Sequence, residues 1–217
     1  MEVLISRLHY PVTALGPGRR VGIWFQGCSI RCRGCISVDT WEPDGRSTVP
    51  VADVLGWLAE LPAGEVDGVT ISGGEPTDQP EALSELLRGI DVWRATRPTS
   101  PPAIDVLLFT GRPPDWVEGP AAKFLAGVDA VVAGPYVARR AGASPLRGSE
   151  NQRLIVLTPL GQERLAEYET SVRARMQVEV TSDGVWMIGI PLPGDMAAFE
   201  AEASARGVIW PERSWLT

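Results

Sequence analysis

The sequence predicts an α/β protein whose strands form an open or partial barrel, and two observations support this class. Short apolar segments that end at glycine, threonine or cysteine read as buried strands, and segments with helical spacing of apolar residues separate them. Strands that alternate with helices form right-handed βαβ units and a parallel sheet. The strand segments are residues 21–26, 68–72, 104–109, 129–133 and 153–157, and the helical segments are residues 50–60, 80–90 and 122–126.

Length and composition set the broad class. The chain has 217 residues, of which 44% are hydrophobic and 22% charged, so it can build a globular core. The formal net charge of −7 argues against nucleic acid as a partner, because binding nucleic acid needs a basic face. We see no apolar run near the ~20 residues that cross a membrane, and no signal peptide at the start. We therefore expect a cytoplasmic protein with neither a membrane nor a nucleic acid as partner.

Two regions are expected along the chain. Residues 1–158 carry the alternating strands and helices, and residues 159–217 form a small C-terminal α+β extension. In the extension we expect a charged helix, a β-hairpin and a last helix, at residues 162–175, 176–190 and 195–206. Composition favours an extension that packs on the core, with docking of a partner as the alternative.

The three cysteines of the chain lie within eight residues, as Cys28, Cys32 and Cys35. An odd number in one CxxxCxxC loop argues against disulfides and favours metal ligands. A structural zinc needs four ligands, and the one histidine, His9, is distant in sequence. A 4Fe–4S cluster held by three thiolates leaves one iron open to a cofactor. We favour the cluster, with zinc and unligated core cysteines as the open alternatives.

A second motif follows the next strand, as SGGEP at residues 72–76. Glycines allow backbone atoms to approach a ligand closely, and the carboxylate of Glu75 comes directly after them. Alone, a Gly-Gly turn after a strand is usually only a turn. Carboxyl ends of parallel strands meet at one edge of the sheet, so this loop and the cysteine loop are expected to face one ligand.

These motifs resemble the radical S-adenosylmethionine (SAM) family, in the branch of enzymes that activate glycyl radical proteins. The resemblance covers residues 5–157. It rests on the cysteine motif, SGGEP, GPGRR at residues 16–20, Thr40-Trp41, DVLLFTG at residues 105–111 and RGSENQR at residues 147–153.

The resemblance implies a mechanism and a site. Cys28, Cys32 and Cys35 would hold three irons of a 4Fe–4S cluster, and SAM would bind the fourth. The cluster would reductively cleave SAM to a 5′-deoxyadenosyl radical that abstracts a hydrogen atom. Residues near SAM would be Gly73, Gly74 and Glu75 at its methionine part, Gly34 and Ile36 at its adenine, and Thr110 at its ribose or methionine part.

The resemblance also implies partners. An electron donor such as flavodoxin or ferredoxin would reduce the cluster, and a glycyl radical protein or peptide would supply the hydrogen atom. The family's ribonucleotide reductase activators are usually shorter, so the extension leaves the target open. The alternatives are a radical SAM enzyme that modifies a small molecule or peptide, and a non-catalytic iron–sulfur or zinc protein.

Overall fold

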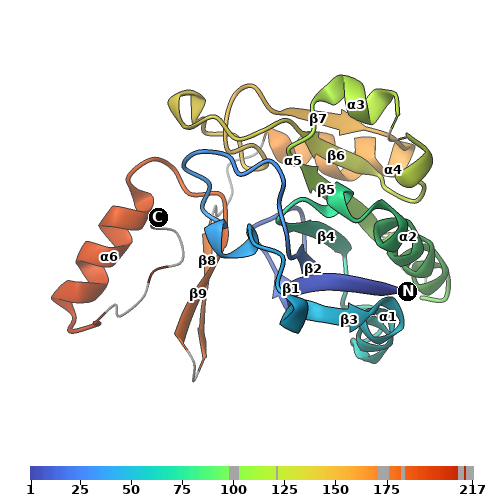
Figure 1. Cartoon of the computed structure of the whole chain (residues 1–217), viewed down its shortest axis with the longest axis horizontal. Coiled ribbons are helices and arrows are strands. Elements are labelled where there is room, and N and C mark those ends of the chain that lie inside the picture. Colours follow the sequence, from blue (N-terminus) through green and yellow to red (C-terminus); the bar gives the residue numbers. More distant parts are fainter. Residues whose placement is uncertain (98–102, 121, 171–175, 182–183, 210–212, 214–217) are drawn as a thin grey trace.

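The computed structural model describes residues 1–97, 103–120, 122–170, 176–181, 184–209 and 213 (Figure 1). The strands are β1 (Glu2–Val12), β2 (Arg20–Phe25), β3 (Thr48–Pro50), β4 (Gly68–Gly73), β5 (Asp105–Thr110), β6 (Ala130–Ala133), β7 (Arg153–Val156), β8 (Met176–Thr181) and β9 (Gly184–Gly189). The α-helices are α1 (Val51–Glu60), α2 (Pro80–Ala95), α3 (Pro114–Glu118), α4 (Pro159–Gly161), α5 (Glu167–Glu169) and α6 (Asp195–Ala205). A π-helical segment, η6 (Gln162–Ala166), joins α4 to α5, and the 3-10 turns are η1 (Val38–Thr40), η2 (Gly45–Ser47), η3 (Pro76–Asp78), η4 (Ala122–Phe124) and η5 (Ala138–Arg140).

A seven-stranded open sheet forms the centre, in the order β3-β1-β2-β4-β5-β6-β7. Strands β2, β4, β5 and β6 are parallel, as the βαβ pattern predicts. The α/β class is therefore confirmed, with a mixed sheet around a parallel centre. The strand expected at residues 153–157 is present as β7, but the parallel direction expected for it is wrong. Strand β7 runs antiparallel to β6, because the chain between them contains only the short turn η5 and no crossover helix.

Two strands at the other edge were not predicted. Strand β1 pairs antiparallel with β2 and with the short strand β3. Its sequence, EVLISRLHYPV, has polar residues on both faces, so it lacks the continuous apolar run of a central strand. An edge position explains this pattern, because one long side of β1 is shared only with three residues of β3.

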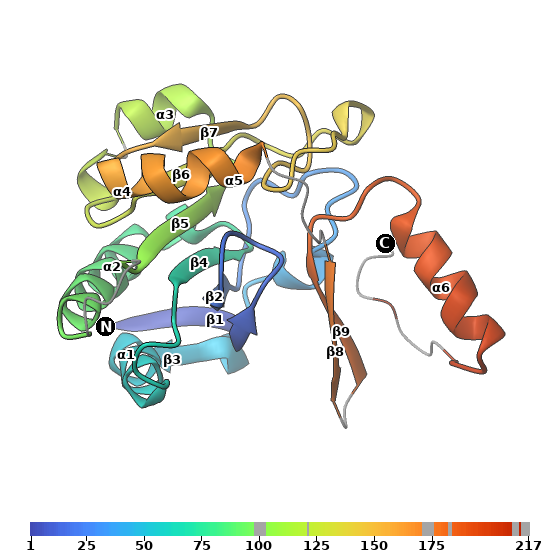
Figure 2. The same cartoon turned by 180° about the vertical axis from the view of Figure 1, so that it is seen from behind.

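The two faces of the sheet are covered differently. Helices α1 and α2 pack on one face through Val54, Leu58, Leu83 and Leu86, in the main hydrophobic core. Segments α4 and α5 lie across the opposite face at β6, as Figure 2 shows. Leu165 and Tyr168 of the segment 159–169 are buried there. No helix in the described part of the chain has the length and apolar character needed to cross a membrane.

The C-terminal hairpin lies beside the sheet face that is opposite α1 and α2, and α6 lies on the outer side of the hairpin (Figure 1). Strands β8 and β9 pair antiparallel, as expected for the hairpin at residues 176–190, and α6 matches the helix expected at residues 195–206. Of the helix expected at residues 162–175, residues 162–169 are helical and residues 171–175 lie outside the described residues, as do residues 182–183 of the expected turn.

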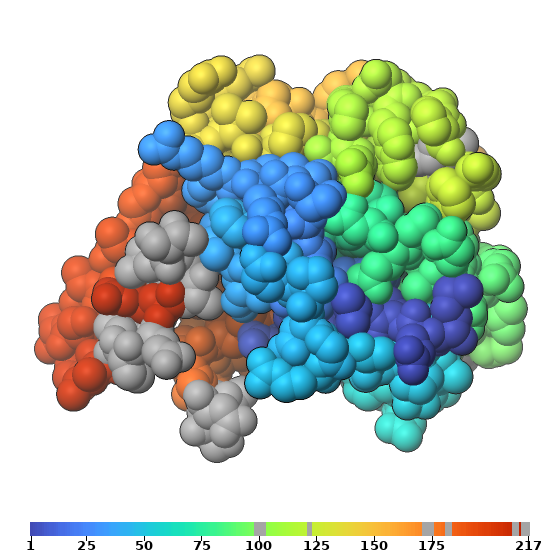
Figure 3. All heavy atoms as spheres, viewed as in Figure 1, coloured from blue at the N-terminus to red at the C-terminus, as the bar shows by residue number. Residues whose placement is uncertain are grey.

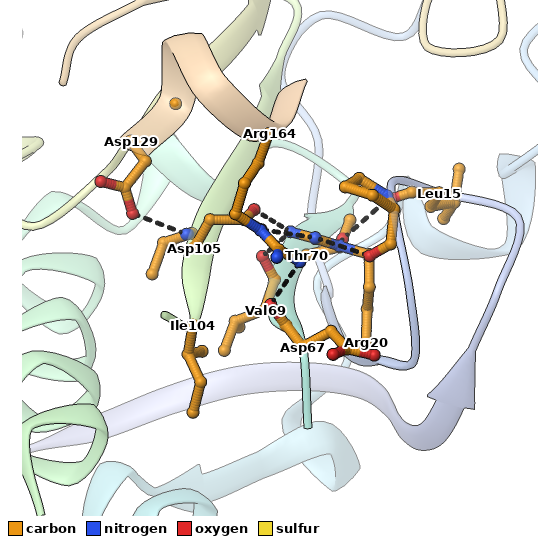
Figure 4. Close-up of polar contacts among 12 residues, drawn as sticks. Leu15, Arg20, Asp67, Val69, Thr70, Ile104, Asp105, Asp129 and Arg164 are labelled. Carbon is orange, nitrogen blue, oxygen red and sulfur yellow. Dashed lines mark hydrogen bonds and ion pairs between the residues drawn. The ribbon is translucent and has the colours of Figure 1, made fainter. Parts of the chain in front are cut away.

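A buried ion network joins the amino ends of the parallel strands (Figure 4). Both carboxylate oxygens of Asp105 on β5 accept hydrogen bonds from Arg20 on β2, at 2.6 and 3.1 Å, and both side chains are 0% exposed. Arg20 also donates to Thr70 Oγ1 at 2.6 Å and to the carbonyl oxygen of Val69 at 2.8 Å, both on β4. Arg164 of η6 adds a second guanidinium, 2.7 Å from Asp105 Oδ2. One carboxylate therefore ties three strands and the segment after β7 together.

Replacing Asp105 with Asn is expected to lower the free energy of unfolding by about 3–5 kcal/mol, because two buried arginines lose the negative charge that offsets their desolvation. Urea unfolding monitored by circular dichroism measures this. The matched control is Glu65→Gln, since the Arg19–Glu65 pair is nearly half exposed and such pairs contribute about 0–1 kcal/mol. Equal losses in the two variants would contradict the role assigned to Asp105.

Candidate active site

The carboxyl ends of the parallel strands meet at one edge of the sheet and border a cavity of about 300 Å³. The cysteine loop follows β2, the Gly-Gly loop follows β4, and Gly111 and Gly134 follow β5 and β6. All four loops line the cavity. The expectation that the motif loops share one edge is therefore confirmed.

Hydrogen bonds fix the beginning of the cysteine loop. The N–H groups of Gly27 and Cys28 donate to the carbonyl oxygens of Thr40 and Trp41, at 2.8 and 2.9 Å. Ser29 donates its N–H and its hydroxyl to the two carboxylate oxygens of Asp78, at 2.7 and 2.8 Å. Asp78 lies in η3, directly after SGGEP, so the two motif loops are bonded to each other.

The three thiols are free, and all of them line the cavity. Burial raises the pKa of the Cys35 thiol above its ordinary value, against the backbone N–H of Ser37 and the indole of Trp41, which lower it. Burial also raises the pKa of Cys32, against the backbone N–H of Tyr136. Without a bound metal these two thiols therefore hold their protons, and a metal has to supply the charge that stabilises the thiolates.

The donor set fits a multinuclear cluster better than a single ion. Within the described residues, no three His, Cys, Asp or Glu side chains are placed to share one metal ion. His9 does not line the cavity, so no histidine completes a Cys3His zinc site there. Thiolates that bind three separate irons lie farther apart than ligands of one ion. The buried indole N–H of Trp41 lies beside the Cys35 thiol, whose pKa it lowers, so it is placed to donate to that sulfur once the thiol becomes a thiolate ligand.

Gly73 and Gly74 bring β4 against the start of the cysteine loop. Gly73 has φ +103°, and a Cβ atom there would lie 2.4 Å from the backbone N of Phe25. A Cβ on Gly74 would lie 2.1 Å from the carbonyl oxygen of Gly27. The N–H of Gly74 donates to Phe25 at 2.8 Å, and that of Glu75 to Gly27 at 2.8 Å. The two glycines thus have a packing role in addition to lining the cavity.

Glu75 and Thr110, which the sequence predicts near SAM, bind each other. The Glu75 carboxylate is 1% exposed and accepts hydrogen bonds from Thr110 Oγ1 at 2.7 Å and from the N–H of Gly111 at 2.8 Å. It also accepts from the N–H and hydroxyl of Thr77, at 3.1 and 2.5 Å. Four donors therefore fix this carboxylate, and it joins the end of β4 to the end of β5.

Gly34 and Ile36 also line the cavity, on the side formed by the loop after β6. Gly34 has φ +80°, and a Cβ atom there would lie 3.4 Å from Ala138 Cβ and 3.6 Å from the ring of Tyr136. In the space-filling view the light-blue cysteine loop lies beside the yellow segment that contains η5 (Figure 3). The cavity therefore brings together every cofactor residue that the sequence predicts.

Several cavity residues were missed by the sequence analysis. Trp24 and Phe109 lie in predicted strands and were not singled out as site residues, but both are only partly buried and line the cavity. Arg7 and Asp39 also line it, and burial raises the pKa of Asp39 while Arg7 lowers it. Side chains alternate along β2, which places Trp24 on the face of the sheet opposite α1 and α2. Strand periodicity could therefore have identified Trp24 as a residue of this face.

Comparison with known proteins identifies the family. The model of the 4Fe-4S single cluster domain family matches residues 14–155. The anaerobic ribonucleoside-triphosphate reductase-activating protein of Enterobacteria phage T4 is 28% identical over 139 residues, which is 64% of this chain and 85% of that protein. The protein of the same name from Vibrio cholerae is 29% identical over 150 residues, 66% of this chain and 92% of that protein.

A second group of relatives matches over a shorter length. The pyruvate formate-lyase-activating enzyme of Clostridium pasteurianum is 38% identical over 76 residues, 34% of this chain and 32% of that enzyme. The chain thus spans only about a third of the length of this relative.

The fold and the three-thiol cavity are those of an iron–sulfur enzyme of the radical SAM class, with a 4Fe–4S cluster and SAM as cofactors. The chain belongs to the 4Fe-4S single cluster domain family, which covers the cysteine loop and the strands β2 to β6 entirely. The resemblance drawn from the motifs is confirmed.

Replacing Gly74 with Ala is expected to destabilise the fold by about 1–3 kcal/mol or more, because the new methyl group meets the fixed backbone of Gly27. Gly56→Ala is the matched control, since Gly56 lies within α1 and a Cβ there meets nothing within 4 Å. That variant is expected to gain about 0.5–1 kcal/mol from the higher helix propensity of alanine. Thermal and urea unfolding measure the stability of both variants. The free energy of unfolding is expected to fall for Gly74→Ala and to rise for Gly56→Ala.

Replacing Glu75 with Gln is expected to cost about 1–3 kcal/mol of unfolding free energy, because the amide nitrogen of Gln cannot accept from the donors that surround Oε1 and Oε2. Urea unfolding of the metal-free protein measures this, with the exposed Glu60→Gln as the control. Unchanged stability together with weakened SAM binding would show that Glu75 acts on the cofactor alone.

Proposed function

We propose that this enzyme uses its cluster and SAM to abstract a hydrogen atom from a glycine of a partner protein, and so activates a glycyl radical enzyme. The observation that carries the proposal is the single cavity that joins three thiols on one loop to the Gly-Gly loop. The names of the relatives, activators of anaerobic ribonucleoside-triphosphate reductase and of pyruvate formate-lyase, support this class of target.

We assign the cluster ligands and the cofactor contacts residue by residue. Cys28, Cys32 and Cys35 would each hold one iron, and the indole N–H of Trp41 would donate to the Cys35 sulfur. This assignment is supported by the free thiols in the cavity and by the buried Trp41 indole beside the Cys35 thiol. When bound, the cluster supplies the electron that cleaves SAM and produces the carbon radical that abstracts hydrogen.

The glycines and the buried carboxylate position SAM. Backbone groups at Gly73 and Gly74 bind its amino group, and backbone groups at Gly34 and Ile36 border its adenine. Glu75 holds Thr110 and the N–H of Gly111 in place, so the end of β5 has a fixed position beside SAM. The aromatic rings of Trp24 and Phe109 line the same cavity and exclude water from it.

We further propose that the sheet forms the partial barrel of radical SAM enzymes, with residues 1–158 as the radical SAM core and residues 159–217 as an extension. The reaction belongs in the cytoplasm, because free thiols and a reducible cluster require a reducing compartment.

An acidic electron carrier such as flavodoxin or ferredoxin fits the surface beside the cluster loop. Arg33 of that loop and Arg139 and Arg140 of η5 are exposed. Gly34 lies against Ala138, so the three guanidinium groups belong to neighbouring segments. A cluster of positive charge steers acidic partners to this face and does so most strongly at low salt.

Replacing Cys32 with Ser is expected to abolish cluster assembly and SAM cleavage, because a cubane cannot keep three protein thiolates after this change. The test is anaerobic reconstitution with iron and sulfide, followed by dithionite and SAM, with 5′-deoxyadenosine and methionine measured by chromatography. The exposed Arg46→Gln serves as the control and is expected to match the wild type. Stoichiometric zinc in place of iron, or undiminished nucleoside from the Ser variant, would refute the proposal.

The glycyl target has its own test. Incubation with a purified anaerobic ribonucleotide reductase, SAM and reductant is expected to give the doublet electron paramagnetic resonance signal of a glycyl radical. Nucleoside production that depends on a small molecule, without any such signal, would assign the enzyme to biosynthesis of a small molecule or peptide instead.

A further inference from the structure

The C-terminal hairpin forms one side of the cavity that holds the three thiols. Residues 185–191 and Met196 line the same cavity as Cys28, Cys32 and Cys35. The family match ends at residue 155, so this side of the cavity lies outside the region that the family model covers. The cavity is therefore built from a family core and a wall that belongs to the extension.

Trp186 of β9 attaches the wall to the sheet. The guanidinium carbon of Arg7 lies 4.4 Å from the centroid of the Trp186 ring, a cation–π contact. Trp24 and His9 meet the same ring edge-on, with centroids 4.9 and 5.0 Å away. Contacts of this kind from β1 and β2 hold the indole in one position.

Two hydrogen bonds and an apolar cluster also hold the hairpin near Trp186. The N–H of Thr13 donates to Gln177 Oε1 at 2.8 Å, and Gln177 Nε2 donates to the carbonyl oxygen of Pro11 at 2.8 Å. Ile188 is 2% exposed and belongs to a cluster with Val12 and Leu15. The hairpin is thus a fixed part of the cavity and not a free arm.

The size of the cavity limits what can react in it. Ligand pockets have volumes of roughly 300–1,000 Å³, and this cavity, at about 300 Å³, is at the lower end. The cluster and SAM residues assigned above come from the loops after β2, β4 and β5, so the hairpin faces the part of the cavity that they leave for the donor. The indole of Trp186 stands in that wall, and a side chain on the donor Cα would compete with it for space.

We propose that the hairpin is the wall on the hydrogen-donor side of the cavity, and that Trp186 is a positioning residue that restricts the donor to a residue as small as glycine. This inference rests on the proposed function. In the reaction a Cα–H bond of the donor breaks and a C–H bond forms at the 5′ carbon of the nucleoside, which leaves the unpaired electron on the donor Cα.

The first test needs no turnover. Trp186→Ala opens the wall, so bathophenanthroline disulfonate, a bulky iron chelator, is expected to remove iron from the reconstituted full-length enzyme several-fold faster than from the wild type. Val180→Ala on the same hairpin is the matched control, because Val180 is 77% exposed, and it is expected to keep the wild-type rate. Trp186→Leu, which retains an apolar side chain, replaces the Ala variant if that variant does not fold.

The second test measures donor size. Two hexapeptides carry deuterium at the central Cα, one with glycine and one with leucine, and transfer of deuterium into 5′-deoxyadenosine is measured by mass spectrometry. The wild type is expected to accept glycine and reject leucine, and removing the indole should reduce this preference by about tenfold or more, as for other pockets that select by size.

Either of two results would contradict the role proposed for Trp186. One is equal chelation rates for the wild type and a folded Trp186 variant, and the other is an unchanged preference for glycine over leucine in that variant. If the wild type cleaves SAM but takes deuterium from neither peptide, the proposed glycyl target fails, while the chelation rates still decide whether Trp186 closes the cavity.

Discussion

The buried pairing of Arg20 with Asp105 is the interaction on which the rest of the structure depends. It fixes the amino ends of β2 and β5 against β4, and Arg164 ties the segment after β7 to the same carboxylate. Because these strands are parallel, fixing their amino ends also sets where their carboxyl ends lie. The cysteine loop, the Gly-Gly loop and Thr110 begin at those ends, so the geometry of the cavity follows from a charge pair on the opposite edge of the sheet.

This pairing gives a physical reason for the arginine in the GPGRR motif. Arg20 does not line the cavity but is wholly buried among backbone and carboxylate acceptors. At the other edge, Asp78 and Glu75 act in the same manner, each accepting from residues of neighbouring loops. A set of buried or half-buried carboxylates therefore holds the loops in place before any cofactor binds.

The sequence predicted the parts of the fold that local patterns encode. Central strands such as β4 are continuous apolar runs, and α1 has helical spacing, so both were predicted to within a residue or two. Edge strand β1 has no such pattern, and the direction of β7 depends on the connection before it, so neither was predicted. The cysteine and glycine loops were found from residue type and spacing, whereas Trp186 belongs to a hairpin whose contact with the cavity arises only in the tertiary fold.

The central claim is that three thiolates hold a cluster with one iron left open to SAM. Electron paramagnetic resonance of the dithionite-reduced enzyme, recorded before and after SAM is added, tests this most directly. The account predicts the spectrum of a reduced 4Fe–4S cluster and a clear change of its g values when SAM binds the open iron. A spectrum that SAM leaves unchanged, or the absence of a cluster signal from fully reconstituted protein, would contradict it.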